Sequence, residues 1–333
     1  MSLRDSILEH PERRYLMFGG KGGLGKTTFS AATAYWLASR GKRVLVFSVD
    51  PQASLSDIFE KDIFGKGPVK MMDNLWAQEV DADRHIRAYQ EEIRAKIRDM
   101  YGFDSVPDEI EQYIQAASAE PAMEESAIFD AVVDIVVTGD YDYYIYDLVP
   151  LGHALYYLSM AKVYDEWINK ITKLREEMRE YEEMVSRLKR EKDTEEDHIL
   201  SELQYIRTRI NASSQILTDK EKTAFYFVVV PEKMIILDTQ KAAVLFSQFD
   251  VPIAGYVVNR VVPEELLGKN IPAYLKHRIE MQKTYMEEIR QVFGDQVSAY
   301  VPELERDVTG LPMIERLAEI MYGDGNHKAG RPR

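Results

Sequence analysis

The chain has 333 residues, a formal net charge of −14 at pH 7 and no cysteine. This length allows one large domain or two of medium size. The lack of cysteine excludes disulfides, thiolate metal sites, iron–sulfur clusters and cysteine nucleophiles. The negative charge argues against broad nucleic-acid affinity, which needs clustered lysine and arginine. No run reaches the roughly 18 apolar residues of a membrane span, and the charged residues 1–14 lack a signal-peptide core. We therefore expect a cytoplasmic protein without an integral membrane segment.

A glycine-rich loop lies between a predicted strand at residues 15–18 and a predicted helix at residues 28–39. It contains Gly20-x-x-x-x-Gly25-Lys26-Thr27, the P-loop pattern. Glycines let backbone N–H groups surround a polyphosphate, and the following helix points its positive end at the anion. We expect Lys26 to reach the β- and γ-phosphates and the Thr27 hydroxyl to bind Mg²⁺. The alternative is an ordinary turn, which the flanking strand and helix disfavour. The residues predicted to contact a nucleoside triphosphate are Gly20, Lys21, Gly22, Gly23, Leu24, Gly25, Lys26, Thr27 and Thr28.

A second lysine, Lys21, lies at the start of the loop. There it is badly placed for its own phosphates but can reach a nucleotide held by a facing subunit. It would then supply positive charge to the transition state, as an arginine finger does. This interpretation predicts a homodimer, whereas the alternative is a solvated lysine on a turn.

The predicted strand at residues 43–49 ends at Asp50, with Asp57 a little further along the chain. A carboxylate just past a strand end can orient or deprotonate the attacking water, and we assign Asp50 to that role. An ordinary helix cap or turn is the alternative, because Pro51 follows. Asp57 is a weaker candidate for a contact in the same loop.

A further predicted strand, residues 143–147, ends at Asp147. An acidic residue at the end of a buried strand is where P-loop enzymes hold Mg²⁺, often through water. Gly152 follows and can bring its N–H group close to the γ-phosphate.

Two segments have helical patterns: residues 83–123, with Pro107 and Pro121 as breakers, and residues 161–217. The second has apolar residues at steps of 3 and 4, lapses over residues 192–197 and resumes, which predicts a charged helical hairpin. We assign both segments to one α-helical subdomain. Residues 1–82, 124–160 and 218–322 form the predicted P-loop domain, and residues 323–333 a flexible tail.

Apolar runs that alternate with helical patterns predict an α/β fold with a doubly wound, mostly parallel sheet. Ligands in such sheets lie beyond the carboxyl ends of the strands, where the motif residues fall. The remaining predicted strands are residues 76–80, 225–230, 252–259 and 297–301.

Together the motifs resemble the arsenite-pump ATPase family, which includes the ATPases that target tail-anchored proteins. The resemblance spans residues 14–322. Its further motifs are Trp76-Ala-Gln-Glu-Val-Asp81, Glu120-Pro-Ala-Met-Glu-Glu125, Val230-Pro-Glu232, Val258-Asn-Arg260, and Pro302 with Gly310.

The resemblance implies an Mg²⁺-dependent ATPase, dimeric or with two fused halves, whose helical subdomains move with nucleotide state. It implies that Lys21 reaches the partner's ATP, Asp50 handles water and Asp147 supports Mg²⁺. Asn259 and Pro302 would flank the adenine, with Arg260 beside them. An asparagine amide can pair with the hydrogen-bonding edge of adenine.

Some residues depart from the family pattern. Gln52-Ala53 and Leu148, Val149 and Leu151 replace the usual neighbours of the two aspartates, so turnover could be slow. Without cysteine, neither a zinc clasp nor arsenite binding through thiolates is possible. The expected partner is a protein client at the helical subdomain, possibly a membrane-protein segment. Methionines in or near the helical segments could line a client groove or fill helical cores: Met71, Met72, Met100, Met123, Met160, Met178 and Met184.

Two other functions stay open from the sequence. The altered loops and the charged hairpin would suit a nucleotide-stabilised scaffold or coiled-coil protein with little turnover. A partition or septum-positioning ATPase shares the Lys21 signature but needs a membrane-binding helix or a basic DNA-binding surface.

Overall fold

The computed structural model describes residues 1–101 except 51 and 53, residues 121–148 and 218–323, and positions 111, 169, 170, 172, 173, 208, 212, 215 and 216. Most of the predicted helical hairpin, the loop with Gly152 and the tail after residue 323 lie outside the described residues. The predictions for those segments therefore stay predictions.

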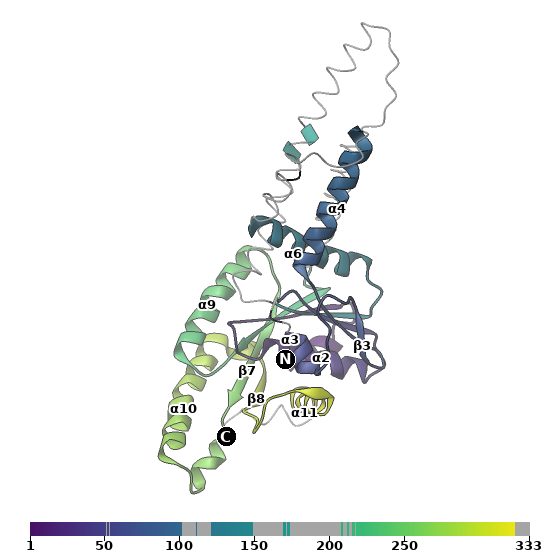
Figure 1. Ribbon diagram of the computed structural model, residues 1–333. Helices are drawn as coiled ribbons and strands as arrows, with labels where there is room; N and C mark the ends of the chain where they lie inside the picture. Colours follow the sequence, from purple (N-terminus) through teal and green to yellow (C-terminus); the bar gives the residue numbers. More distant parts are fainter. Residues whose placement is uncertain are drawn as a thin grey trace.

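In the part of the chain that the structure describes, eight strands form one sheet in the order β3-β4-β2-β5-β1-β6-β7-β8 (Figure 1). All neighbouring strands are parallel except β3, which pairs antiparallel with β4. The predicted mostly parallel α/β fold is confirmed. The strands are β1 Tyr15–Gly19, β2 Val44–Ser48, β3 Val69–Met72, β4 Leu75–Glu79, β5 Tyr143–Asp147, β6 Thr223–Val229, β7 Ile253–Val261 and β8 Val297–Pro302.

The central strands are apolar except at their ends because both of their faces are covered by helices. Every residue of β2, β5 and β6 is buried. A strand of this kind shows no polar alternation. Aromatic side chains fill much of the interior, and the rings of Phe47 and Tyr146 stack across β2 and β5 with centroids 4.6 Å apart.

One face of the sheet carries α1 Leu3–Leu8, α2 Lys26–Ala38, α3 Ser54–Phe59 and α11 Gly310–Tyr322. Phe18 on β1 lies against Phe29 on α2, with ring centroids 6.5 Å apart. Farther along α2, the Thr33 hydroxyl shares a 2.6 Å hydrogen bond with the Tyr322 hydroxyl of α11. These contacts fix the helix that follows the glycine loop against the sheet.

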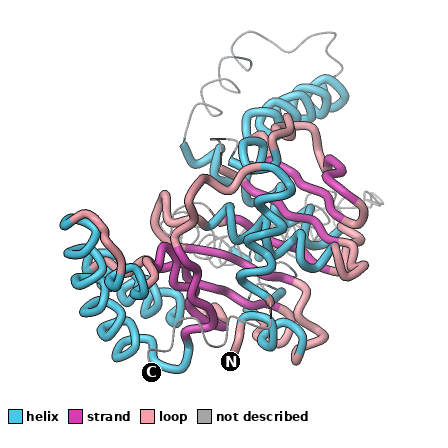
Figure 2. The backbone as a smooth tube through the Cα atoms, turned by 90° about the horizontal axis from the view of Figure 1, so that it is seen from below, coloured by secondary structure: helices cyan, strands magenta, loops and turns pink. Residues whose placement is uncertain are grey.

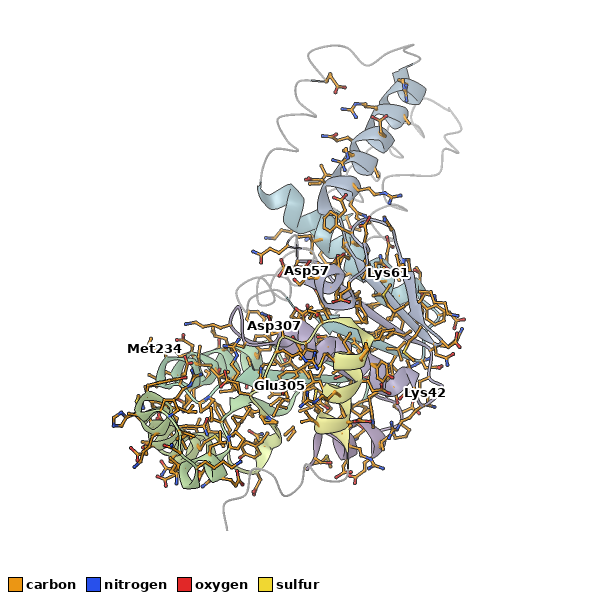
Figure 3. The ribbon with its side chains drawn as sticks, turned by 60° about the horizontal axis from the view of Figure 1, so that its bottom comes forward. Lys42, Asp57, Lys61, Met234, Glu305 and Asp307 are labelled. Carbon is orange, nitrogen blue, oxygen red and sulfur yellow. The ribbon has the colours of Figure 1, made fainter. Side chains whose placement is uncertain are left out.

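The opposite face carries α6 Pro121–Thr138, α9 Lys233–Gln248 and α10 Ala273–Phe293 (Figures 1 and 2). The Tyr15 hydroxyl donates to the Val136 carbonyl of α6 at 3.2 Å. Phe225 on β6 contacts Phe246 on α9 with ring centroids 4.5 Å apart. The α9 end that bears Met234 is well separated from the end of α3 near Lys61 (Figure 3). Two 3₁₀ helices, η1 Glu264–Gly268 and η2 Gly294–Gln296, flank α10.

The helix α4, Ala82–Tyr101, contacts α6 and extends away from the sheet (Figure 1). Its helical character agrees with the prediction for residues 83–123. Pro121, predicted as a helix breaker, is the first residue of α6. Proline is tolerated there because its missing N–H group falls in the first turn. The predicted boundary between residues 123 and 124 therefore lies inside one continuous helix.

The short strand β3 was missed by the sequence interpretation, which placed Met71 and Met72 in or near the helical segments. Both residues lie in this strand. It forms a hairpin with β4 through Asn74, whose φ of 64° is left-handed. Asparagine tolerates that conformation better than most residues do.

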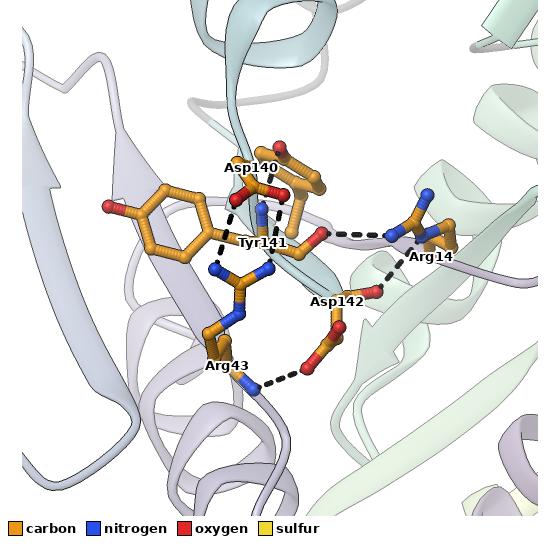
Figure 4. Close-up of polar contacts among 6 residues, drawn as sticks. Arg14, Arg43, Asp140, Tyr141 and Asp142 are labelled. Atoms are coloured by element: carbon orange, nitrogen blue, oxygen red, sulfur yellow. Dashed lines mark hydrogen bonds and ion pairs between the residues drawn. The ribbon is translucent and has the colours of Figure 1, made fainter.

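At the amino edge of the sheet, charged side chains connect the starts of three strands (Figure 4). The Arg43 guanidinium donates two 3.0 Å hydrogen bonds to the Asp140 carboxylate, and the Arg43 backbone N–H donates to Asp142 at 2.8 Å. Arg14 donates to the carbonyls of Tyr141 and Asp142, both at 3.3 Å. These contacts join β1, β2 and β5, the strands whose opposite ends carry the predicted site.

Candidate nucleotide-binding site

Three strands bring the predicted site residues to one edge of the sheet. In the strand register, Phe18 of β1 and Ser48 of β2 both lie opposite Asp147 of β5. The glycine loop follows β1, Asp50 follows β2, and Asp147 ends β5. Because parallel strands end at the same edge, segments far apart in the sequence meet there.

The backbone of the glycine loop adopts conformations that favour glycine. Gly23 has a φ of 74° and Gly25 a φ of 98°, both left-handed. Gly25 is the N-cap of α2, and a Cβ atom there would lie 2.7 Å from the Asn259 side-chain nitrogen. No atom lies within 4 Å of a Cβ built on Gly22 or Gly23. The space beside the Cα atoms of Gly22 and Gly23 is therefore open.

Three carbonyl oxygens of the loop accept hydrogen bonds from side chains. The Lys26 ammonium donates to the Lys21 carbonyl at 3.2 Å. The Arg260 guanidinium donates to the Gly23 carbonyl and the Asn259 amide to the Leu24 carbonyl, each at 2.8 Å. Carbonyl oxygens repel an anion, so engaging them with donors makes the loop more favourable for phosphate.

Asn259 and Pro302 lie near each other at the ends of neighbouring strands. Pro302 pairs in register with Val261, two residues after Asn259. The Asn259 side-chain oxygen accepts from the Arg260 N–H group at 2.8 Å, and Arg260 has a left-handed φ of 55°. Asn259 therefore supports the loop directly, a role that sequence reasoning missed. Its predicted contact with adenine stays a prediction.

Asp147 is the buried carboxylate of the site, with 2% of its surface exposed. Burial raises the pKa of Asp147 to about 7, while the Thr27 hydroxyl, which donates to it, and the charge of Lys26 oppose that rise. Ser30 also donates to its Oδ1 atom at 3.4 Å. Burial lowers the pKa of Lys26, and the charges of Asp147 and Asp50 act against that shift. A hydroxyl beside a carboxylate is a donor set that suits Mg²⁺, which prefers oxygen ligands.

Asp50 is half-buried just beyond β2. Its backbone N–H donates to the Ser48 hydroxyl at 3.2 Å, and its Oδ1 atom accepts from the Gln52 N–H at 3.0 Å. The Ser48 hydroxyl in turn donates to the Asp147 carbonyl at 3.4 Å. Asp50 thus forms the turn expected in the alternative interpretation, and Ser48 links the backbones of the two aspartates.

Glu79 lies within the motif Trp76-Ala-Gln-Glu-Val-Asp81, and no role was predicted for it from the sequence. Glu79 is 1% exposed at the end of β4. Its carboxylate accepts from the N–H groups of Leu55 and Ser56 at 2.6 and 3.1 Å, and from the Ser56 hydroxyl at 2.5 Å. It therefore caps α3, the helix that carries the exposed Asp57 just after the Asp50 turn. An acidic residue that ends a buried strand was the available signal.

Lys21 lies on the exposed part of the loop, with half of its side-chain surface accessible. Its ammonium is 2.5 Å from the Asp238 carboxylate of α9. The structure thus gives Lys21 a partner within the same chain, and its predicted contact with the nucleotide of a facing subunit stays a prediction.

A glycine loop between β1 and α2, with a terminal lysine, a hydroxyl and a buried aspartate at the carboxyl edge, defines a P-loop nucleotide-binding protein. The anion-transporting ATPase family model matches residues 13–323. The chain belongs to this family of ATPases, which confirms the resemblance seen in the sequence motifs.

Curated relatives align along almost the whole chain. A protein of Aquifex aeolicus, provisionally named arsenical pump-driving ATPase 1, is 33% identical over 93% of this chain and 79% of its own. ATPase ASNA1 homolog 2 of Paramecium tetraurelia is 27% identical over 95% of each chain. ATPase GET3A of Arabidopsis thaliana is 28% identical over 93% of this chain and 84% of its own.

None of the helices in the described part of the chain is both long enough and apolar enough to cross a bilayer.

Proposed function

We propose that the protein is an Mg²⁺-dependent ATPase that works as a dimeric, nucleotide-driven conformational switch. The observation that carries this proposal is the arrangement of the half-buried Lys26 and Thr27 around the buried Asp147, directly behind the glycine loop. Membership of an ATPase family supports the reaction class.

The residues of the loop would bind the triphosphate of ATP. Lys26 would leave the Lys21 carbonyl for the phosphates, and the Thr27 hydroxyl would turn toward Mg²⁺ with Asp147 behind it. Bound Mg²⁺ would neutralise charge that develops on the phosphates. The loop residues proposed to contact the nucleotide are Gly20, Lys21, Gly22, Gly23, Leu24, Gly25, Lys26, Thr27 and Thr28.

Asp50 would hold the attacking water through the oxygen that the Gln52 turn leaves available. Gly152, outside the described residues, would contact the γ-phosphate. Asn259, Arg260 and Pro302 would form the base side of the pocket. The junction of β7 and β8 supports this placement, because it lies at the same edge of the sheet as the loop.

Lys21 would act on the nucleotide of a second copy of the chain. Its position at the exposed outer end of the loop supports that role, because Lys26 already serves the chain's own phosphates. A homodimer with two facing loops would supply each site with one additional cation.

The helical subdomain, residues 83–123 and 161–217, would bind a protein client, possibly a membrane-protein segment. The extension of α4 away from the sheet supports a separate role for this part of the chain. The resemblance of the sequence motifs to the ATPases that target tail-anchored proteins supports a targeting-type function in the cytoplasm.

The test is ATP hydrolysis by Lys26→Ala and Asp50→Asn variants, with Lys42→Ala as the control, an exposed lysine in the segment between α2 and β2. We expect the first two changes to slow turnover roughly 100-fold or more and the control to leave it unchanged. Sedimentation with and without MgATP tests the dimer. Unchanged turnover in both site variants would contradict the assignment, and ATP that stays intact for hours on wild-type protein would favour the scaffold alternative.

A further inference from the structure

The ion pair between Lys21 and Asp238 joins the glycine loop to α9. The two residues come from segments that follow β1 and β6, which are neighbours in the sheet. Asp238 is 28% exposed and lies one helical turn after Met234, which is 63% exposed. The pair therefore lies at the accessible end of the site, where a second chain could reach it.

Asp238 is well suited to hold a cation and to release it. Lys21 lowers the pKa of Asp238, mainly through its hydrogen bond, and the charge of Lys241 lowers it further. Lys241 lies three residues along α9 from Asp238, on the same side of the helix. If Lys21 leaves, Asp238 keeps a neighbouring positive charge, so its carboxylate is not left uncompensated.

We propose that Asp238 is a holding site that keeps Lys21 within its own chain until two subunits bind MgATP, when Lys21 transfers to the partner's triphosphate. The inference rests on the proposed function of Lys21. The Asp238 carboxylate competes with the more highly charged triphosphate for the Lys21 ammonium, so Asp238 influences the dissociation constant of the dimer. It is a positioning residue and does not touch the reacting atoms.

The test is the dimer dissociation constant, measured by analytical ultracentrifugation with Mg²⁺ and a slowly hydrolysed ATP analogue. Asp238→Asn removes the competing charge and should lower the dissociation constant about two- to five-fold, the range of an exposed ion pair. Glu288→Gln is the matched control, because it removes another ion pair of α9, between Lys233 and Glu288, in which no residue of the glycine loop takes part. That control should leave the dissociation constant unchanged.

Lys21→Ala separates the inference from the proposed function on which it depends. Lys21→Ala should weaken the dimer, and adding Asp238→Asn to it should have no further effect, since Asp238 then has nothing to hold. A weakened Lys21→Ala dimer combined with an unaffected Asp238→Asn dimer would overturn the holding site alone. An effect of Asp238→Asn that persists without Lys21 would also overturn it, because the role would then be structural.

If Lys21→Ala changes neither dimer formation nor hydrolysis, the proposed function of Lys21 is wrong and the holding site falls with it. Thermal unfolding of each variant is measured first. Asp238→Ser replaces Asp238→Asn if the amide variant unfolds early, with the same expected shift.

Discussion

Glu79 and Ser56 are joined by two hydrogen bonds, one to the backbone N–H of Ser56 and one to its hydroxyl. The Ser56 hydroxyl also accepts from the Ile63 N–H at 3.1 Å, so the link extends to the segment after α3. One buried carboxylate therefore holds the start of α3, the helix that follows the Asp50 turn. A buried acceptor with three donors is costly to replace, because each donor loses its partner.

Glu79→Gln tests this arrangement. The amide oxygen can keep both backbone N–H donors, but its NH₂ group then faces the Ser56 hydroxyl, which already accepts from the Ile63 N–H. The Ser56 hydroxyl loses its acceptor, so we expect a loss of about 1–3 kcal/mol in the free energy of unfolding. Urea unfolding measures the loss, and single-turnover hydrolysis should slow as the Asp50 turn loosens. Glu280→Gln, an exposed acid on α10, is the control and should change neither quantity. Wild-type stability in Glu79→Gln would show that the carboxylate does not support α3.

Asn259→Ala distinguishes two roles for the asparagine. Asn259→Ala removes the hydrogen bond to the Leu24 carbonyl and so loosens the glycine loop. We therefore expect any nucleotide to bind about 2- to 10-fold more weakly. If Asn259 acts only on the loop, the affinities for ATP and GTP fall by the same factor. If it also pairs with adenine, the affinity for ATP falls more than the affinity for GTP. Calorimetric titration measures how much the affinity for ATP and for GTP falls. Unchanged affinity for both nucleotides would exclude both roles.

Gly25→Ala should abolish nucleotide binding while the sheet stays folded. The added Cβ atom would lie 2.7 Å from the Asn259 side-chain nitrogen. Alanine would also have to adopt the left-handed φ of 98° that Gly25 has. Alanine at Gly22 meets no atom within 4 Å of its Cβ, so this change tests whether the backbone there must approach phosphate closely. Circular dichroism confirms folding, and calorimetry with MgATP reports binding. Normal binding by Gly25→Ala would show that the loop tolerates a shift.

Asp147 predicts a dependence of stability on pH. Burial raises its pKa to about 7 in the folded chain, against about 3.9 when unfolded. Between these values the folded state binds more protons than the unfolded state, so this residue makes stability fall as pH rises. The slope is at most about 1.4 kcal/mol for each pH unit.

Unfolding of nucleotide-free, metal-free protein between pH 4.5 and 8 measures this slope. The free energy of wild type minus that of Asp147→Asn should decrease from low to neutral pH, because the amide does not titrate. This difference removes the contributions of other groups. A difference that stays constant or increases would contradict the raised pKa.

Tyr322→Phe should cost stability without changing catalysis. Thr33 donates to the Phe29 carbonyl at 2.7 Å and shares a second hydrogen bond with the Tyr322 hydroxyl. Burial raises the pKa of Tyr322 well above 10, so its hydroxyl stays a donor at neutral pH. We expect a loss of about 0.5–1.5 kcal/mol, and a double-mutant cycle with Thr33→Val measures the coupling. Slower ATP hydrolysis would show that the outer end of α2 also affects the loop.

The sequence predicted those parts of the molecule whose signal is local. The glycine loop is one continuous motif, and the buried strands are continuous apolar runs, so residues 143–147 were predicted with the bounds of β5. The strand β3 was missed because it is a short edge strand with mixed exposure, paired through a hairpin and not through an apolar pattern.

The interactions that were missed join residues far apart along the chain. The bonds from Asn259 to Leu24, from Lys21 to Asp238 and from Glu79 to α3 depend on strand order, which no local pattern specifies. Glu79 looks like an ordinary polar residue at a strand end until α3 is placed beside it. Asp50 shows the converse, since its local turn was foreseen as an alternative and is present.

The hydrogen bond of 2.6 Å between Ser6 of α1 and Tyr226 of β6 has a practical consequence for anyone who produces this protein. Deleting residues 1–13 would strip a fully buried tyrosine of its partner and uncover the site of Leu3 and Ile7, both completely buried. Met1, by contrast, is 61% exposed. An affinity tag belongs ahead of an intact first helix, and trimming toward the glycine loop would yield aggregating material.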